Sequence, residues 1–218
     1  MNWLTSVLKF FQEGGIFMWP IAIVMVLGLA IAIERYLYLT RQAMRNRELW
    51  NELVPHLQSG NFRQAVQITS KSPSFIATIL NYGLARIQSA RRRDDIEKAM
   101  EESLMEVMPK LEKRTHYLAS FANIATLLGL LGTIIGLIQA FQAVGAANPA
   151  EKADLLSASI SVAMNTTAFG LMVAIPLLLI HSVIQSKTTE LIDSLEMASV
   201  KFLNAITERQ SVGSPQAG

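Results

Sequence analysis

The sequence of 218 residues has no cysteine and few charged residues. Without cysteine, a disulfide scaffold, a thiolate metal site, an iron–sulfur cluster and a cysteine nucleophile are all excluded. Charged residues make up 17% of the chain and hydrophobic residues 51%, with a mean hydropathy of +0.32, which is too apolar for an ordinary soluble domain. The net charge of only +2 gives no indication of a nucleic acid partner. The composition therefore indicates a membrane protein.

Three long stretches lack Asp, Glu, Lys and Arg, namely residues 14–33, 115–150 and 155–186. As a helix, a stretch of about 20 residues is about 30 Å long, which matches the hydrocarbon core of a bilayer. The second and third stretches are longer than one crossing requires, and the polar sequence beyond them keeps a helical period. The sequence predicts an all-α, polytopic integral membrane protein with three transmembrane helices and long cytoplasmic helical extensions. The predicted transmembrane helices cover residues 14–35, 115–147 and 157–186.

The orientation follows from the basic residues that flank these helices. Residues 35–114 contain fourteen Lys and Arg against nine Asp and Glu, and Lys187 follows the third span on the same side. The positive-inside rule therefore places this side in the cytoplasm. The remaining predicted segments are an amphipathic helix in the outer interface, a cytoplasmic helical domain, an outer loop, a cytoplasmic C-terminal helix and a disordered tail. In the same order they cover residues 1–13, 36–114, 148–156, 187–210 and 211–218.

The cytoplasmic segment has helical periodicity with turn signals at residues 59–61 and at Ser72-Pro73. Ser72 is expected to cap a helix that begins at Pro73, and residues 91–95 are expected to start another helix with its acids in the first turn. Pro109 is expected to interrupt and bend that helix. No catalytic constellation and no metal-ligand spacing is present, so neither a metal nor a cofactor is expected.

Small residues form a stripe along each of the last two predicted spans. Steps of three and four residues on a helix keep to one face. The stripes include Gly129, Gly132, Gly136 and Ala140 in the second span, and Ala163, Gly170 and Ala174 in the third. Small faces let helices approach closely in lipid, where association depends on packing. Two interpretations remain open: the stripes pack against each other, or they surround a further helix.

Polar side chains accompany the stripes at membrane depth. They are Thr126, Thr133, Asn165, Thr166 and Thr167. A single threonine hydroxyl can bond back to its own helix, but as a group these residues favour a polar lumen or a site for a guest helix. Pro176 is expected to kink the third span.

None of the three uncharged stretches contains Asp or Glu. Proton and sodium relays through membranes usually depend on such a group. If ions move along this protein, another chain is expected to supply the carboxylate.

Two sequence segments are similar to motifs of the MotA/TolQ/ExbB proton channel family. Residues 127–136 (LLGLLGTIIG) resemble its GLLGTVxG-like segment, and residues 167–176 (TAFGLMVAIP) resemble its TxxGLxxAIP segment. Three spans with an outer N-terminus resemble the ExbB/TolQ branch more than the MotA branch, and the resemblance covers nearly the whole chain.

The resemblance implies a homopentamer in the bacterial inner membrane, with a periplasmic N-terminus and a cytoplasmic C-terminus. It implies that the ring encloses two ExbD/TolR-type subunits, each with one span and a membrane aspartate, and that Thr133 and Thr167 line the ion path. Many relatives carry a glutamate five residues before the second threonine, where this chain has Val162. The implied function is the coupling of proton flow to mechanical work on the cell envelope, without covalent chemistry. The resemblance also implies a TonB- or TolA-like protein as a further partner. A MotA-like flagellar or gliding stator and a non-conducting membrane scaffold are the alternatives.

Overall fold

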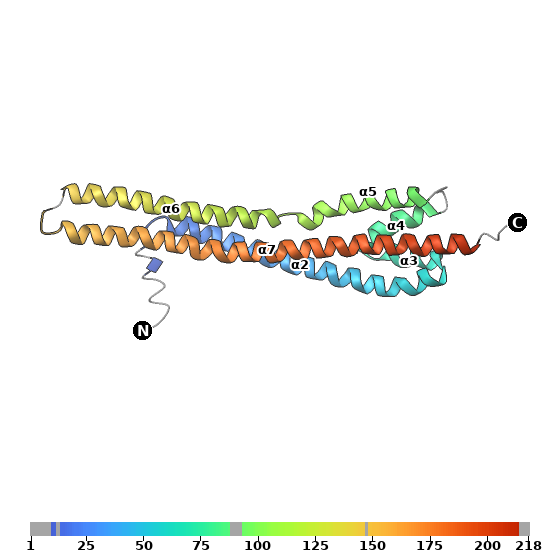
Figure 1. Cartoon of the computed structure of the whole chain (residues 1–218). Helices are drawn as coiled ribbons and strands as arrows, with labels where there is room; N and C mark the ends of the chain where they lie inside the picture. Colours follow the sequence, from blue (N-terminus) through green and yellow to red (C-terminus); the bar gives the residue numbers. More distant parts are fainter. Residues whose placement is uncertain (1–9, 12–13, 88–92, 147, 214–218) are drawn as a thin grey trace. The chain divides into compact units, whose positions relative to one another are not determined.

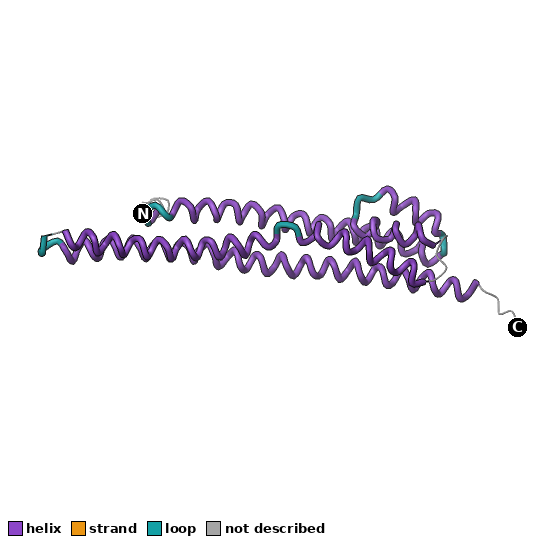
Figure 2. Tube along the Cα trace, turned by 90° about the horizontal axis from the view of Figure 1, so that it is seen from above, coloured by secondary structure: helices purple, strands orange, loops and turns teal. Residues whose placement is uncertain are grey.

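The computed structural model describes residues 10–11, 14–87, 93–146 and 148–213. Helices joined by short loops make up this part of the chain (Figures 1 and 2). The chain divides into two compact units. Residues 1–35 and 114–184 form one, here called the apolar unit, and residues 36–113 and 185–218 form the other, here called the charged unit.

Three long helices carry the apolar sequence: α2 (Met18–Ser59), α6 (Thr115–Ala146) and α7 (Lys152–Gly213). Each contains a stretch that is long and apolar enough to cross a membrane. Three further helices, α3 (Phe62–Lys71), α4 (Phe75–Ile87) and α5 (Arg93–Glu112), lie between α2 and α6 in the sequence. The prediction of an all-α protein with three membrane-spanning helices is therefore confirmed.

In the apolar unit, α6 and α7 lie side by side and antiparallel (Figure 1). The loop between them is shorter than the expected 148–156, because α7 already begins at Lys152. The Glu151 amide donates to the Asn148 carbonyl at 3.0 Å, and Asp154 lies in the first turn of α7, where the helix dipole favours an acid. The α2 helix packs on the same unit, since Gly28 lies directly against the Leu177 side chain.

The charged unit has a core of large side chains. Leu53, Leu80, Met100 and Phe202 are each at most 1% exposed. They come from α2, α4, α5 and α7, and α4 can pack among them because Gly83 has no side chain. A Cβ atom at Gly83 would lie 2.7 Å from Met100 Sδ and 2.9 Å from Phe202 Cε1.

Two turns separate α2, α3 and α4. Gly60 has φ +76°, a conformation that favours glycine, and the Asn61 side chain accepts a hydrogen bond from the Gln64 amide at 3.2 Å. The turn at residues 59–61 was predicted. The expected start of the next helix at Pro73 is wrong, because α4 begins at Phe75 and Ser74 caps it instead of Ser72. Ser74 is fully buried, and its Oγ accepts from the Ala77 amide at 3.3 Å.

The predicted helix start near residues 91–95 is confirmed at Arg93, with Asp94 and Asp95 in the first turn of α5. Pro109 does not interrupt this helix, because one missing donor is tolerated and the Lys113 amide still reaches the Pro109 carbonyl at 3.0 Å. The interruption comes at Arg114, whose φ of +66° ends the helical path before α6.

The α7 helix runs through Pro176 without interruption and continues to Gly213, so residues 211–213, expected in the tail, are helical. Residues 214–218 lie outside the described part, as do 1–9 and 12–13 of the expected outer-interface helix. Phe10 and Phe11, which are described, both pack edge-on against the ring of Phe169, with centroids 6.2 and 5.0 Å apart.

Candidate functional site: the threonine pair between α6 and α7

The small faces of α6 and α7 meet at two glycines. A Cβ atom at Gly129 would lie 3.2 Å from the Cα of Thr167 and 3.3 Å from that of Gly170. A Cβ atom at Gly170 would lie 2.7 Å from the Ala125 carbonyl oxygen. These contacts are with backbone atoms, which cannot move aside as a flexible side chain can. Glycine at both positions therefore permits the helices to approach at the level of the backbone.

The other members of the stripes continue this contact along the two helices. A Cβ atom at Gly136 would lie 2.9 Å from Ala163 Cβ, and Gly132 faces Thr166 Cγ2. Ala140 and Ala174 are also buried, at 0% and 2% exposure. Within one chain, the small faces of α6 and α7 thus pack against each other, which was one of the two interpretations left open.

Thr133 and Thr167 lie next to this close contact and join the two helices. Their hydroxyl groups form a hydrogen bond with each other. Thr167 Oγ1 donates to the Gly129 carbonyl at 2.8 Å, and Thr133 Oγ1 lies 3.3 Å from the carbonyl oxygens of both Gly129 and Ala163. Both threonines are half-buried. The structure therefore brings the two predicted threonines together as one polar group at membrane depth.

Thr166 has a different environment from its neighbour. It is 2% exposed, and its hydroxyl donates to the Gly14 carbonyl at 2.5 Å. Val162, one turn earlier, lies against Gly15, where a Cβ atom would be 3.3 Å from Val162 Cγ1. This face of α7 thus holds the segment that precedes α2. The sequence did not predict this hydrogen bond, because its acceptor is a backbone carbonyl, which does not depend on the residue type.

Thr126 and Asn165 lie away from the threonine pair. Thr126 is exposed, and its hydroxyl bonds back to the Ala122 carbonyl at 3.1 Å. Asn165 is half-buried and makes no hydrogen bond within the described part of the chain. It precedes Thr167 by two residues, about 200° around a helix, so the two side chains leave α7 in nearly opposite directions.

The chemistry available at this site is that of hydroxyl and carbonyl groups. Such groups can coordinate a cation or donate and accept hydrogen bonds, but they do not exchange a proton readily near neutral pH. No group of three or more His, Asp or Glu side chains that could hold a metal ion occurs among the described residues. The acids nearest in sequence to the two threonines are Glu151 in the loop before α7 and Asp154 in its first turn, both outside the uncharged stretches. The site is thus a neutral, polar element in an apolar helix pair.

Residues 71–197 match the MotA/TolQ/ExbB proton channel family, over more than half of the chain and including both threonines. The chain belongs to this family. It is also similar to a protein from Methanothermobacter thermautotrophicus that is named a biopolymer transport protein ExbB homolog, with 28% identity over 199 residues. That alignment covers 90% of this chain and 69% of the relative. Membership confirms the resemblance, and a membrane protein of a proton channel family agrees with the three apolar helices.

Proposed function

We propose that this member of the proton channel family is an ExbB/TolQ-like subunit of an ion-driven motor in a bacterial inner membrane. Five copies form a ring around the spans of two ExbD/TolR-type partner subunits. Proton flow along the ring moves the partner helices, and a TonB- or TolA-like protein transmits the resulting work to the cell envelope. The N-terminus is periplasmic and the C-terminus cytoplasmic, as the basic residues at the span ends favour.

The observation that carries this proposal is a polar threonine pair in a protein without a membrane carboxylate. The hydroxyls of Thr133 and Thr167 can solvate a moving ion, but no Asp or Glu occurs in the three apolar stretches. A proton path therefore needs a second chain that brings an exchangeable group to the hydroxyls. In the proposed complex, the aspartate of the single-span partner has this role.

The close packing of α6 on α7 supports the same proposal. Gly129 and Gly170 hold the two helices together, so the threonine pair has a fixed position on the wall that the partner helix meets. Large apolar side chains such as Leu127, Leu130 and Leu171 are exposed on other faces of the unit, where lipid or neighbouring copies can cover them. A charge that crosses 100 mV releases about 2.3 kcal/mol, which is enough to drive small movements of a loosely held helix.

Ion flux through reconstituted liposomes tests this function. We expect the purified chain alone to conduct poorly under an imposed proton gradient, and the aspartate-bearing partner to raise the flux. A partner with Asp→Asn should fail to do so, because the exchangeable group is lost. Equal flux with and without the partner would show a self-sufficient channel and would overturn the proposal.

The double variant Thr133→Val/Thr167→Val tests the site in the same assay. Valine keeps the side-chain shape but deletes both hydroxyls, so we expect flux with the partner to fall at least about tenfold, a change of about 1.4 kcal/mol in the barrier. Ring assembly should be unchanged by native mass spectrometry. The matched control is Thr126→Val, which removes an exposed hydroxyl bonded only to its own helix. If the double variant and the control conduct equally, the threonine pair serves packing alone.

A further inference from the structure

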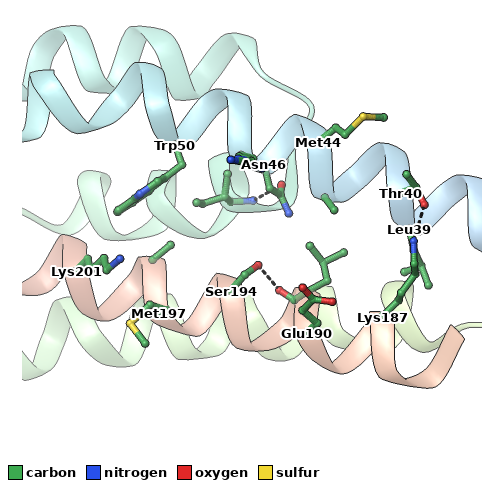
Figure 3. A pocket seen from close by; sticks show the side chains of 15 residues that line it. Leu39, Thr40, Met44, Asn46, Trp50, Lys187, Glu190, Ser194, Met197 and Lys201 are labelled. Carbon is green, nitrogen blue, oxygen red and sulfur yellow. Dashed lines mark hydrogen bonds between the residues drawn. The ribbon is translucent and has the colours of Figure 1, made fainter. Parts of the chain in front are cut away.

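The charged unit contains a pocket of about 540 Å³ between α2 and α7. Its wall includes Leu39, Ile76, Leu191 and Ala198, which are themselves buried. Trp50 and Met197 line it as well (Figure 3). The pocket is large enough for several side chains, and its apolar wall favours an occupant that is partly apolar.

A buried polar atom of a residue that lines this pocket has no hydrogen-bond partner among the described residues. Asn46 is 4% exposed, and its Oδ1 accepts a hydrogen bond from the Ile76 amide at 3.3 Å. Its Nδ2 is buried and has no acceptor within the part of the chain that the structure describes, and Asn46 is one of the residues that line the pocket. Figure 3 shows the Asn46 side chain on the side of α2 that faces α7. Because an unpaired buried donor is costly, this atom indicates an occupant that carries an acceptor oxygen.

The charges around the pocket indicate that this acceptor is anionic. Three cations, Arg47, Lys187 and Lys201, line the pocket with one acid, Glu190. Lys187 Nζ donates to Thr40 Oγ1 at 3.2 Å and lies 4.0 Å from the centre of the Tyr36 ring. Arg47 and Lys201 form no ion pair within the described residues. In Figure 3, Lys187 and Lys201 lie towards opposite ends of the pocket.

A surface of opposite character occurs on α5 of the same unit. Lys98, Glu101, Glu102, Met105 and Glu106 line a shallow depression. Met105 is 69% exposed, and the three glutamates around it form no ion pair within the part of the chain that the structure describes. This surface, here called the acidic face, offers an apolar side chain between carboxylates. The apolar side chain complements the apolar wall of the pocket, and the carboxylates complement its cations.

The two surfaces also lie at the same height along the helices. In the charged unit, α5 and α7 run antiparallel. Arg93 Nη2 donates to Asn204 Oδ1 at 3.0 Å, and the side chains of Met100 and Phe202 both lie against Gly83. If Arg93 is level with Asn204, or Met100 with Phe202, an equal rise along the two antiparallel helices places Met105 level with residues 192–197 of α7. Of these residues, Ser194 and Met197 line the pocket. Rotation about an axis parallel to these helices keeps each residue at its height. In a ring of identical copies, the acidic face of one copy therefore lies at the height of the pocket of the next.

We propose that the pocket between α2 and α7 binds the acidic face of α5 from a second copy of this chain. Met105 enters the apolar part of the pocket, and the neighbouring glutamates bind Arg47, Lys201 and Asn46 Nδ2. The contact joins two different surfaces, so it repeats from copy to copy, and it closes as a ring where the rotation between neighbours divides a full turn. It rests on the ring assembly proposed above, and it specifies which surfaces of the charged unit form the contact.

Cysteine cross-linking tests this contact directly, because the chain has no cysteine of its own. We expect the double variant Met105→Cys/Met197→Cys to give a ladder of covalent oligomers up to the full ring when the full-length protein is oxidised in membranes. Each single variant should give no ladder, and the two single variants mixed should give only dimers. The matched control is Tyr82→Cys/Met197→Cys, since Tyr82 is exposed on α4 outside both surfaces and should give no ladder.

A charge reversal gives a second measurement. Lys201→Glu in the double-cysteine variant should lower the rate of cross-linking about tenfold, and adding Glu102→Lys should restore it, because opposite charges then meet again. Failure of this rescue would contradict the proposed pairing.

The oligomeric state by native mass spectrometry separates the possible failures. An intact ring without a ladder would overturn this contact and leave the proposed function standing, whereas a monomer would overturn both. Cross-linking of Met105→Cys alone would show a two-fold contact instead. If no ladder forms and Lys201→Glu releases a bound phospholipid, the pocket is a lipid site and the proposal is wrong.

Discussion

The apolar unit and the charged unit hold their helices together with different side chains. In the apolar unit, α6 and α7 meet through Gly129, Gly170 and a hydroxyl pair, while large residues such as Leu127 and Leu179 are 62% and 65% exposed. In the charged unit, Leu53 and Phe202 are fully buried. Large apolar side chains are thus exposed along the helices of the apolar unit beside buried ones, whereas in the charged unit they form the core.

This difference follows from the solvent around each unit. In water, burying large apolar side chains stabilises a core by about 25 cal/mol per Å². Lipid is as apolar as leucine, so that driving force is absent between helices in a membrane, and close packing with hydrogen bonds replaces it. The comparison predicts that added volume at the helix contact costs the apolar unit more stability than the loss of one hydrogen bond or cap costs the charged unit.

The largest effect is expected from added volume at the helix contact. Gly170→Ala places a methyl group against the Ala125 carbonyl and the backbone of Gly129, so α6 and α7 must move apart. We expect the free energy of unfolding in detergent to fall by about 2–3 kcal/mol, as in other overpacked contacts. Unfolding in SDS, followed by circular dichroism, measures this change.

The matched control for this substitution is Gly145→Ala near the end of α6, where nothing lies within 4 Å of the added atom. Alanine favours a helix more than glycine does, so this variant should be as stable as the parent or slightly more stable. Equal loss in both variants would show that the glycines of α6 and α7 do not act through close contact.

A lost hydrogen bond in the charged unit should have a smaller effect. Asn46→Ala removes the acceptor of the buried Ile76 amide at the start of α4. We expect the free energy of unfolding to fall by about 1–2 kcal/mol, because the amide is left without a partner. Asn51→Ala, an exposed position on the same helix, is the control, and thermal unfolding measures both. Equal melting temperatures for the two variants would remove Asn46 as a structural link between α2 and α4.

The smallest effect concerns the cap of α4. Ser74→Ala deletes the acceptor of the Ala77 amide, and we expect a loss of about 1 kcal/mol. The Ser72 hydroxyl donates to the Ser74 hydroxyl at 3.0 Å and accepts from the Ser74 amide at 3.4 Å. The bond from the Ser72 amide to the Thr69 carbonyl does not depend on the side chain, so Ser72→Ala should cost less. Thermal unfolding of the two variants ranks them, and a larger loss for Ser72→Ala would restore it as the residue that determines the helix start.

The long helices of the fold could be predicted from the sequence because charge-free stretches and their basic flanks act over many residues. Local boundaries were less predictable. Ser72 and Ser74 are both good caps, and only the burial of Ser74 against neighbouring helices distinguishes them. Pro109 was expected to interrupt α5, but the break lies at Arg114, a residue type that rarely adopts positive φ.

The candidate site could be predicted in part. The small stripes indicated that Gly129 and Gly170 lie at a helix contact, and Thr133 and Thr167 were expected together. Whether the stripes meet each other or a further helix depends on how the chain folds back on itself, which residue types alone do not specify. The bond from Thr166 to the Gly14 carbonyl could not be predicted, because any residue provides such an acceptor.

The short loop between α6 and α7 has a consequence for how the protein is made. Because α7 begins at Lys152, the two helices are neighbours in sequence and form a hairpin whose contacts need no distant part of the chain. The hydroxyls of Thr133 and Thr167 find each other within that hairpin. A newly synthesised chain can therefore enter the bilayer with these polar groups already paired.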